Sequence, residues 1–159
     1  MEEAEYLALL QRVDDPVYAE FPPDYDKRGA VKKFGTLVAV LQARLGCLLE
    51  EKHDIQDASH HGAAYLPYDA LTEEYVTSVR ASNFGNLATL WNEESIVLPS
   101  YYSVIRWTLE EHGYIYVPSA VLHLPYTGKN PAITNTPGMK NADGSIRVPS
   151  WGDRFFDYL

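Results

Sequence analysis

Cysteine is almost absent from the sequence, and no long apolar run occurs in it. Cys47 is the only cysteine among 159 residues, so no disulfide can form within the chain. The N-terminus carries acids where a secretory signal carries lysine or arginine before an apolar run. No apolar stretch approaches the roughly 18 residues that a membrane span needs. We therefore expect a soluble cytoplasmic protein that does not bind membranes.

Basic residues are also few, with 13 lysines and arginines against 22 aspartates and glutamates and a net charge of −9. Residues 1–26 hold eight of these acids against Arg12 alone, so the excess lies at one end of the chain. Nucleic-acid binding needs clustered cations that neutralise phosphates. The charge pattern argues against a nucleic-acid partner and favours a basic protein.

Signatures of common enzyme chemistry are missing as well. The sequence has no G-x-S-x-G elbow, no P-loop and no G-x-G-x-x-G turn, which are typical of acyl transfer and nucleotide binding. Cys47 follows the predicted C-terminus of a helix, where the negative end of the helix dipole disfavours a thiolate. We interpret it as a small core residue. The sequence favours a non-enzymatic role, and we expect no cofactor.

The residues that are present predict one domain of the α+β class. A chain of 159 residues can bury about two thirds of the surface that it exposes when unfolded. Strands clustered between two main helices, without alternating β-α-β units, predict two layers: an antiparallel sheet of about four to five strands with both helices on one face. The expected parts of this domain, 1–159, are an acidic helix and arm (1–26), an α+β core (27–124), a Pro/Gly-rich loop (125–150) and an aromatic tail (151–159).

Three segments have the periodicity of helices. Residues 3–13 predict a short helix, which a proline-rich linker or arm follows. The clearest helix is expected over 27–45, with Asp26 as its N-cap and Gly46 just after its end. A third helix is expected to begin after Pro99 and to end at Gly113.

Strands are expected between and after these helices. Residues 47–55 and 61–67 are compatible with strands, and 74–92 predicts a hairpin because Gly85 can supply a positive φ at its turn. A short strand is expected to end at Pro118.

The last 35 residues differ in character from the core. Residues 125–150 contain four prolines and three glycines, so no long regular element is expected there. Residues 151–159 bring four aromatic side chains together. We expect this tail to dock into a groove, because so much apolar surface is unfavourable in water.

Two adjacent histidines, His60 and His61, stand at the start of a predicted strand. Because consecutive side chains of a strand point to opposite faces, we expect one ring to face the domain and the other to face water. The alternative is a metal site in which His53, Asp57 and His60, together with Asp54, converge around a turn. This grouping lacks the H-E-x-x-H or C-x-x-C spacing of strong zinc signatures, so no metal is the favoured interpretation.

The acidic arm and the hairpin tip supply the predicted partner-binding residues. Charge would raise the association rate, and aromatic rings would supply desolvated contacts. Alternatively, these rings fold back over the long helix, the acids only keep the protein soluble, and Phe84 curls onto the sheet. The predicted residues are Asp14, Asp15, Tyr18, Glu20, Phe21, Asp24, Tyr25, Asp26 and Phe84.

Two functions follow from these patterns. The first is a small binding protein, for instance an immunity-type inhibitor of a basic protein such as a nuclease toxin. The second is a small metal-dependent hydrolase that uses the His/Asp cluster of residues 53–61, with 125–150 as a lid. The first is favoured because the acids and rings of the arm are present together, whereas no ligand set has the spacing of a known metal site.

Overall fold

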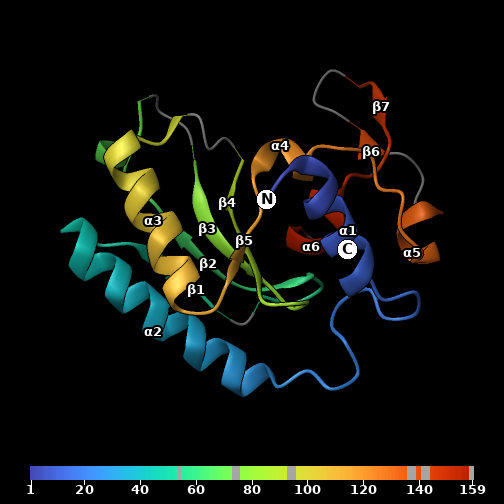
Figure 1. The fold of residues 1–159 in the computed structure, drawn as a ribbon, viewed down its shortest axis with the longest axis horizontal. Coiled ribbons are helices and arrows are strands. Elements are labelled where there is room, and N and C mark those ends of the chain that lie inside the picture. Colours follow the sequence, from blue (N-terminus) through green and yellow to red (C-terminus); the bar gives the residue numbers. More distant parts are fainter. Residues whose placement is uncertain (54, 73–75, 93–95, 136–138, 141–143, 158–159) are drawn as a thin grey trace.

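The chain folds into a five-stranded sheet with helices on both sides (Figure 1), together with a separate two-stranded sheet formed by residues 139–140 and 146–147. The computed structural model describes residues 1–53, 55–72, 76–92, 96–135, 139–140 and 144–157. Its helices are α1 (Glu3–Val13), α2 (Lys27–Leu45), α3 (Pro99–Glu111), α4 (Ser119–Leu122), α5 (Pro131–Thr134) and α6 (Trp151–Phe156), with a short 3₁₀ turn, η1 (Tyr68–Ala70). Its strands are β1 (Glu50–Lys52), β2 (His60–Tyr65), β3 (Ser78–Ser82), β4 (Leu87–Trp91), β5 (Ile115–Tyr116), β6 (Met139–Lys140) and β7 (Ile146–Arg147).

The sheet has the order β1-β2-β3-β4-β5 and is mixed at one edge. The first four strands pair with one another in antiparallel fashion, with Glu50 opposite Tyr65 and Ser78 opposite Trp91. β5 runs parallel to β4, and α3 makes the crossover between them. β4, α3 and β5 thus form a single β-α-β unit at this edge, which the sequence did not indicate because a two-residue strand carries too little pattern to show its direction.

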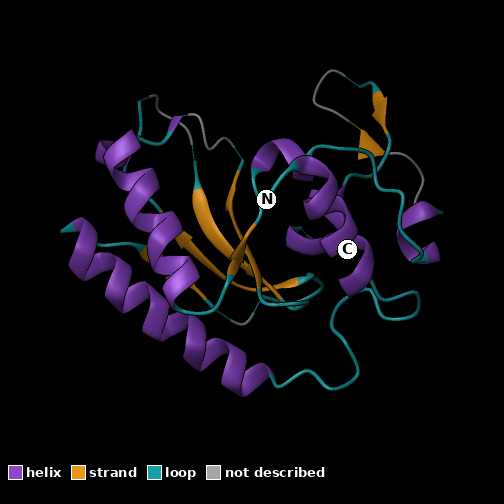
Figure 2. Cartoon of the chain, viewed as in Figure 1, coloured by secondary structure: helices purple, strands orange, loops and turns teal. Residues whose placement is uncertain are grey.

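α2 and α3 pack together on one face of the sheet, as predicted (Figure 2). Their buried apolar side chains form a single cluster with inward-facing residues of the strands. Phe34 and Leu41 of α2, Ile105 of α3, and Val79 and Leu90 of the sheet all belong to it. The α+β class with two main helices on one face is confirmed.

A second apolar cluster lies across the sheet, among α1, α4 and α6. The predicted docking of the aromatic tail is confirmed for its described residues, since Trp151, Phe155 and Phe156 are fully buried in this cluster. Leu10 of α1 and Leu122 of α4 pack in the same cluster. The opposite face of the sheet thus carries a layer that the two-layer prediction did not include.

Local signals place several element boundaries where the sequence predicted them. The carboxylate of Asp26 accepts a hydrogen bond of 2.9 Å from the Gly29 amide and begins α2, and Gly46, with φ of 67°, ends it. Gly85, with φ of 59°, forms the turn between β3 and β4. β3 begins later than predicted, at Ser78, and residues 74–75 of the predicted strand lie outside the described residues.

The Pro/Gly-rich stretch has only short elements in its described residues, namely α5, β6 and β7. Within the ranges that the structure describes, no helix combines the length and apolar character required to cross a bilayer.

Candidate functional site

The arm, residues 15–26 between α1 and α2, has no helix or strand. Its shape comes from buried and half-buried side chains that donate hydrogen bonds to its backbone. Arg154 of α6 donates to the carbonyl oxygens of Tyr18 at 3.0 Å and Ala19 at 2.7 Å. Asn130 donates to the carbonyl of Asp15 at 2.8 Å, and Asn83 donates to that of Glu20 at 2.8 Å. Three elements remote in sequence therefore fix one short segment.

Arg154 itself is fully buried and paired with Asp14. Its Nε donates to Oδ1 of Asp14 at 2.7 Å, and its guanidinium lies over the rings of Phe84 and Phe155, at 4.3 and 4.9 Å from their centroids. The other carboxylate oxygen of Asp14 accepts from the hydroxyl of Tyr126 at 2.6 Å. Because Asp14 is neutralised inside the protein, its prediction as a partner-binding residue was wrong.

With the arm's carbonyls bound from inside, its apolar side chains face outward. Val17 is 74% exposed, and Tyr18 and Phe21 are each 45% exposed. A loop that only covered the core would place these side chains inward and its backbone polar groups toward water. Tyr18 and Phe21 therefore lie on the surface where the sequence placed them, and Val17 joins them without having been predicted.

The acids of the arm have different roles. The carboxylate of Asp15 accepts from the amides of Tyr18 and Val17, at 2.9 and 2.8 Å, and these hydrogen bonds hold its pKa below the ordinary value. Asp26 caps α2 and is exposed, as is Asp24, while Glu20 is half-buried. These four carboxylates remain at the surface of the arm or close to it.

Tyr25 turns inward and ties the arm to the core. Its ring stacks on Phe21 with centroids 5.9 Å apart and lies 6.1 Å from the ring of His61. Among the described residues its buried hydroxyl has no hydrogen-bond partner, and burial raises its pKa. Tyr25 is thus half-buried, and its ring packs against Phe21 instead of being freely exposed for contacts.

Phe84 does not belong to any exposed surface. It is only 2% exposed and packs edge-to-face against Phe155, with ring centroids 5.8 Å apart. Its proposed role as a recognition residue at the hairpin tip was wrong. The ring curls into the second apolar cluster, in line with the alternative that it packs onto the sheet.

The two histidines are both buried, so the expected division between core and water was wrong. His60 is 1% exposed and His61 7%. The pairing with β3 shifts by one residue between His60 and Gly62, and a β-bulge of this kind breaks the alternation of faces. Burial, with some repulsion from Arg80, lowers the pKa of His60 to about 3; burial lowers that of His61 to about 4 despite a hydrogen bond to Asn83. Both rings are therefore neutral at pH 7.

The metal alternative finds no support in the described part of the chain. His53 contacts Glu51 at 3.0 Å, His60 is buried in the sheet, and Asp57 is exposed in a turn with φ of 52°. Asp54 lies outside the described residues. Across the residues that are described, no three His, Cys, Asp or Glu side chains come together as metal ligands.

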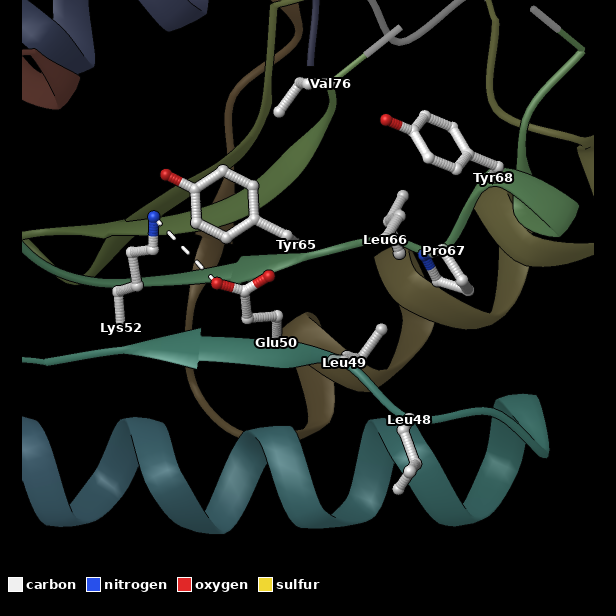
Figure 3. Close-up of a pocket in the computed structure, with 9 residues that line it drawn as sticks. All are labelled: Leu48, Leu49, Glu50, Lys52, Tyr65, Leu66, Pro67, Tyr68 and Val76. Atoms are coloured by element: carbon white, nitrogen blue, oxygen red, sulfur yellow. Dashed lines mark ion pairs between the residues drawn. The ribbon is translucent and has the colours of Figure 1, made fainter. Parts of the chain in front are cut away.

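A pocket of about 140 Å³ lies beside the arm and is lined by Phe21, Tyr25 and both histidines. A second pocket, of about 510 Å³, lies at the β1 edge of the sheet. Figure 3 shows the ion pair of Glu50 and Lys52, 4.0 Å apart, along one side of this edge pocket. The edge pocket is also lined by three exposed apolar side chains, those of Leu48, Tyr68 and Val76.

Sequence reasoning missed the residues that shape the arm. Arg154, Asn83 and Asn130 stand in three unrelated segments, and none carries a local signal beyond a polar side chain among apolar neighbours. The strongest of these signals belongs to Arg154, because "WGDRFFDYL" places one guanidinium inside an aromatic segment that is predicted to be buried. A buried guanidinium requires partners.

Comparison of the chain with protein-family models, with curated proteins and with solved structures finds no match. The site therefore has to be interpreted from its own geometry.

Proposed function

We propose that this chain is a cytoplasmic protein-binding module whose arm docks onto a basic protein. The most specific form of the proposal is an immunity-type inhibitor that binds a basic toxin such as a nuclease. Exposed rings of the arm would make the buried contacts of the interface, and its carboxylates would set the choice of partner.

The observation that carries the proposal is the orientation of the arm. Donors from the buried Arg154 and Asn130 and from the half-buried Asn83 hold its carbonyls inward. Val17 and Tyr18 consequently face water, although apolar burial would favour the reverse. Exposed apolar groups on a fixed segment are typical of a surface that a partner covers.

Charge supports a basic partner. Residues 15–26 contain four acids and no base, even with Asp14 set aside. Negative potential around apolar anchors accelerates the approach of a positively charged protein and weakens as salt rises. Lys27 and Arg28 follow the arm directly, so the acidic segment ends where α2 begins.

The experiment is a capture at low salt from the source cells, with the purified chain as bait, followed by association kinetics with the recovered basic protein. We expect the association rate to fall as salt rises. Glu20→Gln with Asp24→Asn should lower this rate several-fold at low salt, because both remove carboxylates from the arm.

The matched control is Glu3→Gln with Asp69→Asn, which removes the same charge from two exposed positions outside the arm. Equal association rates for the arm variant and the control variant would contradict the proposed surface, as would recovery of a partner whose binding ignores salt.

A further inference from the structure

Arg154 fixes the arm from a helix at the other end of the chain. Its Nε is used by Asp14, and both of its terminal nitrogens face the arm, donating to the carbonyls of Ala19, Tyr18 and Asp15 at 2.7, 3.0 and 3.5 Å. We infer that Arg154 is a positioning residue, which holds Tyr18 and Phe21 outward so that a partner meets a preformed surface. This inference rests on the proposed function.

The geometry needs arginine rather than any cation. A guanidinium presents five donors in a rigid plane, whereas a lysine ammonium is a single point with three donors. Only the planar group can pair with Asp14 on one side and reach separate carbonyls on the other. An Arg154→Lys variant would therefore keep a charge beside Asp14 but release most of the arm.

A pure role in stability would not require these contacts to be with the arm. A buried guanidinium needs partners for all of its N–H groups, and Asp14 with the rings of Phe84 and Phe155 meets only part of this need. The terminal nitrogens meet the rest with carbonyls of the arm, and so restrict a segment whose side chains of Val17, Tyr18 and Phe21 are exposed to water. Restricting a binding segment in advance reduces the entropy lost on association.

The test for a fixed arm needs no partner. Chymotrypsin can cut after Tyr18, whereas Phe21 is followed by Pro22, which blocks cleavage there. Although Tyr18 is exposed, a fixed backbone does not fit a protease, so the wild-type chain should resist cleavage at this bond. Arg154→Lys should raise the cleavage rate there on the order of 10- to 100-fold, since proteolysis follows local opening.

The matched control is Arg147→Lys, because Arg147 also pairs with a buried carboxylate, that of Asp153, and its hydrogen bonds there do not involve the arm. It should leave cleavage at Tyr18 unchanged. Equal cleavage of the two variants would overturn the inference.

Amide hydrogen exchange gives a second test that does not depend on the folding of any variant. The amides of Val17 and Tyr18 donate to the Asp15 carboxylate, so they should exchange slowly in the wild-type chain. Exchange at the rate of an unstructured peptide would show that the arm is not preformed, and would overturn the inference.

Kinetics with the captured basic protein separate this inference from the proposed function. Arg154→Lys should slow association and change dissociation little, because a mobile arm is competent only part of the time. If the variant opens the arm but associates at the wild-type rate, the positioning role is wrong and the docking function stands. If Tyr18→Ala with Phe21→Ala leaves binding unchanged, the docking function itself is wrong.

Discussion

At the scale of single residues, Gly62 sets how closely α2 approaches the sheet. A Cβ atom at this position would lie 2.8 Å from Cγ of Phe34 and closer still to two other atoms of the ring. Phe34 is fully buried, so its ring has no space into which it can withdraw. The absence of a side chain at Gly62 is therefore a condition of the contact between α2 and β2.

Gly62→Ala should accordingly destabilise the protein by about 1–3 kcal/mol, the usual cost of overpacking a core. The control is Gly35→Ala on α2, where the nearest atom to the new Cβ is 3.7 Å away. Because alanine favours helix over glycine, this change should stabilise the fold by up to about 1 kcal/mol. Urea unfolding of both variants measures the difference, and equal effects would contradict the tight contact.

The buried histidines make stability depend on pH. Their pKa values are about 3 for His60 and about 4 for His61 in the folded protein, against an ordinary value of 6.5 when unfolded. Because the unfolded chain binds these protons first, stability is complete above pH 6.5 and falls as the pH drops toward 4. The loss at pH 5 should be about 2 kcal/mol for each ring.

Urea unfolding at pH 7 and pH 5 checks this prediction. His61→Gln should remove about 2 kcal/mol of the difference between the two conditions. His123→Gln serves as the control, because His123 is exposed and should leave the difference unchanged. A wild-type protein that is equally stable at both pH values would show that the rings are not buried as neutral groups.

At the scale of elements, α6 lies near the C-terminus and packs in one apolar cluster with α1 near the N-terminus. Ser150 and Asp153 begin it with a reciprocal capping box, and its aromatic side chains fill the second cluster. Phe155→Ala should cost about 3–5 kcal/mol, because the ring is fully buried. Phe21→Ala, which truncates an exposed ring of the arm, should change stability by less than about 0.5 kcal/mol. Thermal or urea unfolding would contradict the assignment if the two costs were similar.

The elements differ in how far the sequence predicted them, and the reason is the range of the interactions involved. The start of α2 depends on Asp26 and its end on Gly46, and both signals act within a few residues. The direction of β5 depends on its partner strand, and the bulge at His61 depends on the register with β3. Local periodicity indicates neither the direction of β5 nor the position of the bulge.

At the scale of the whole molecule, the account depends on contacts between the two ends of the sequence. Tyr18, Phe21 and Asp24, which the sequence placed in an arm where acids and rings alternate, are exposed, and their role in binding stays a prediction. It could not show that Asp14 is bound by Arg154, since that pair joins residues 140 positions apart. Long-range pairing of buried polar groups is what separates the structural carboxylate of Asp14 from the carboxylates that stay at the surface.

The most direct measurement of the central claim is the dissociation constant of the captured basic protein for two double variants. Tyr18→Ala with Phe21→Ala removes apolar contacts from the arm, and Leu48→Ala with Tyr68→Ala removes apolar side chains that are even more exposed from the β1 edge pocket. If the arm is the docking surface, its variant should bind on the order of 10- to 1000-fold more weakly, while the edge variant binds as the wild type does. Loss of binding in the edge variant, with full affinity in the arm variant, would contradict the account.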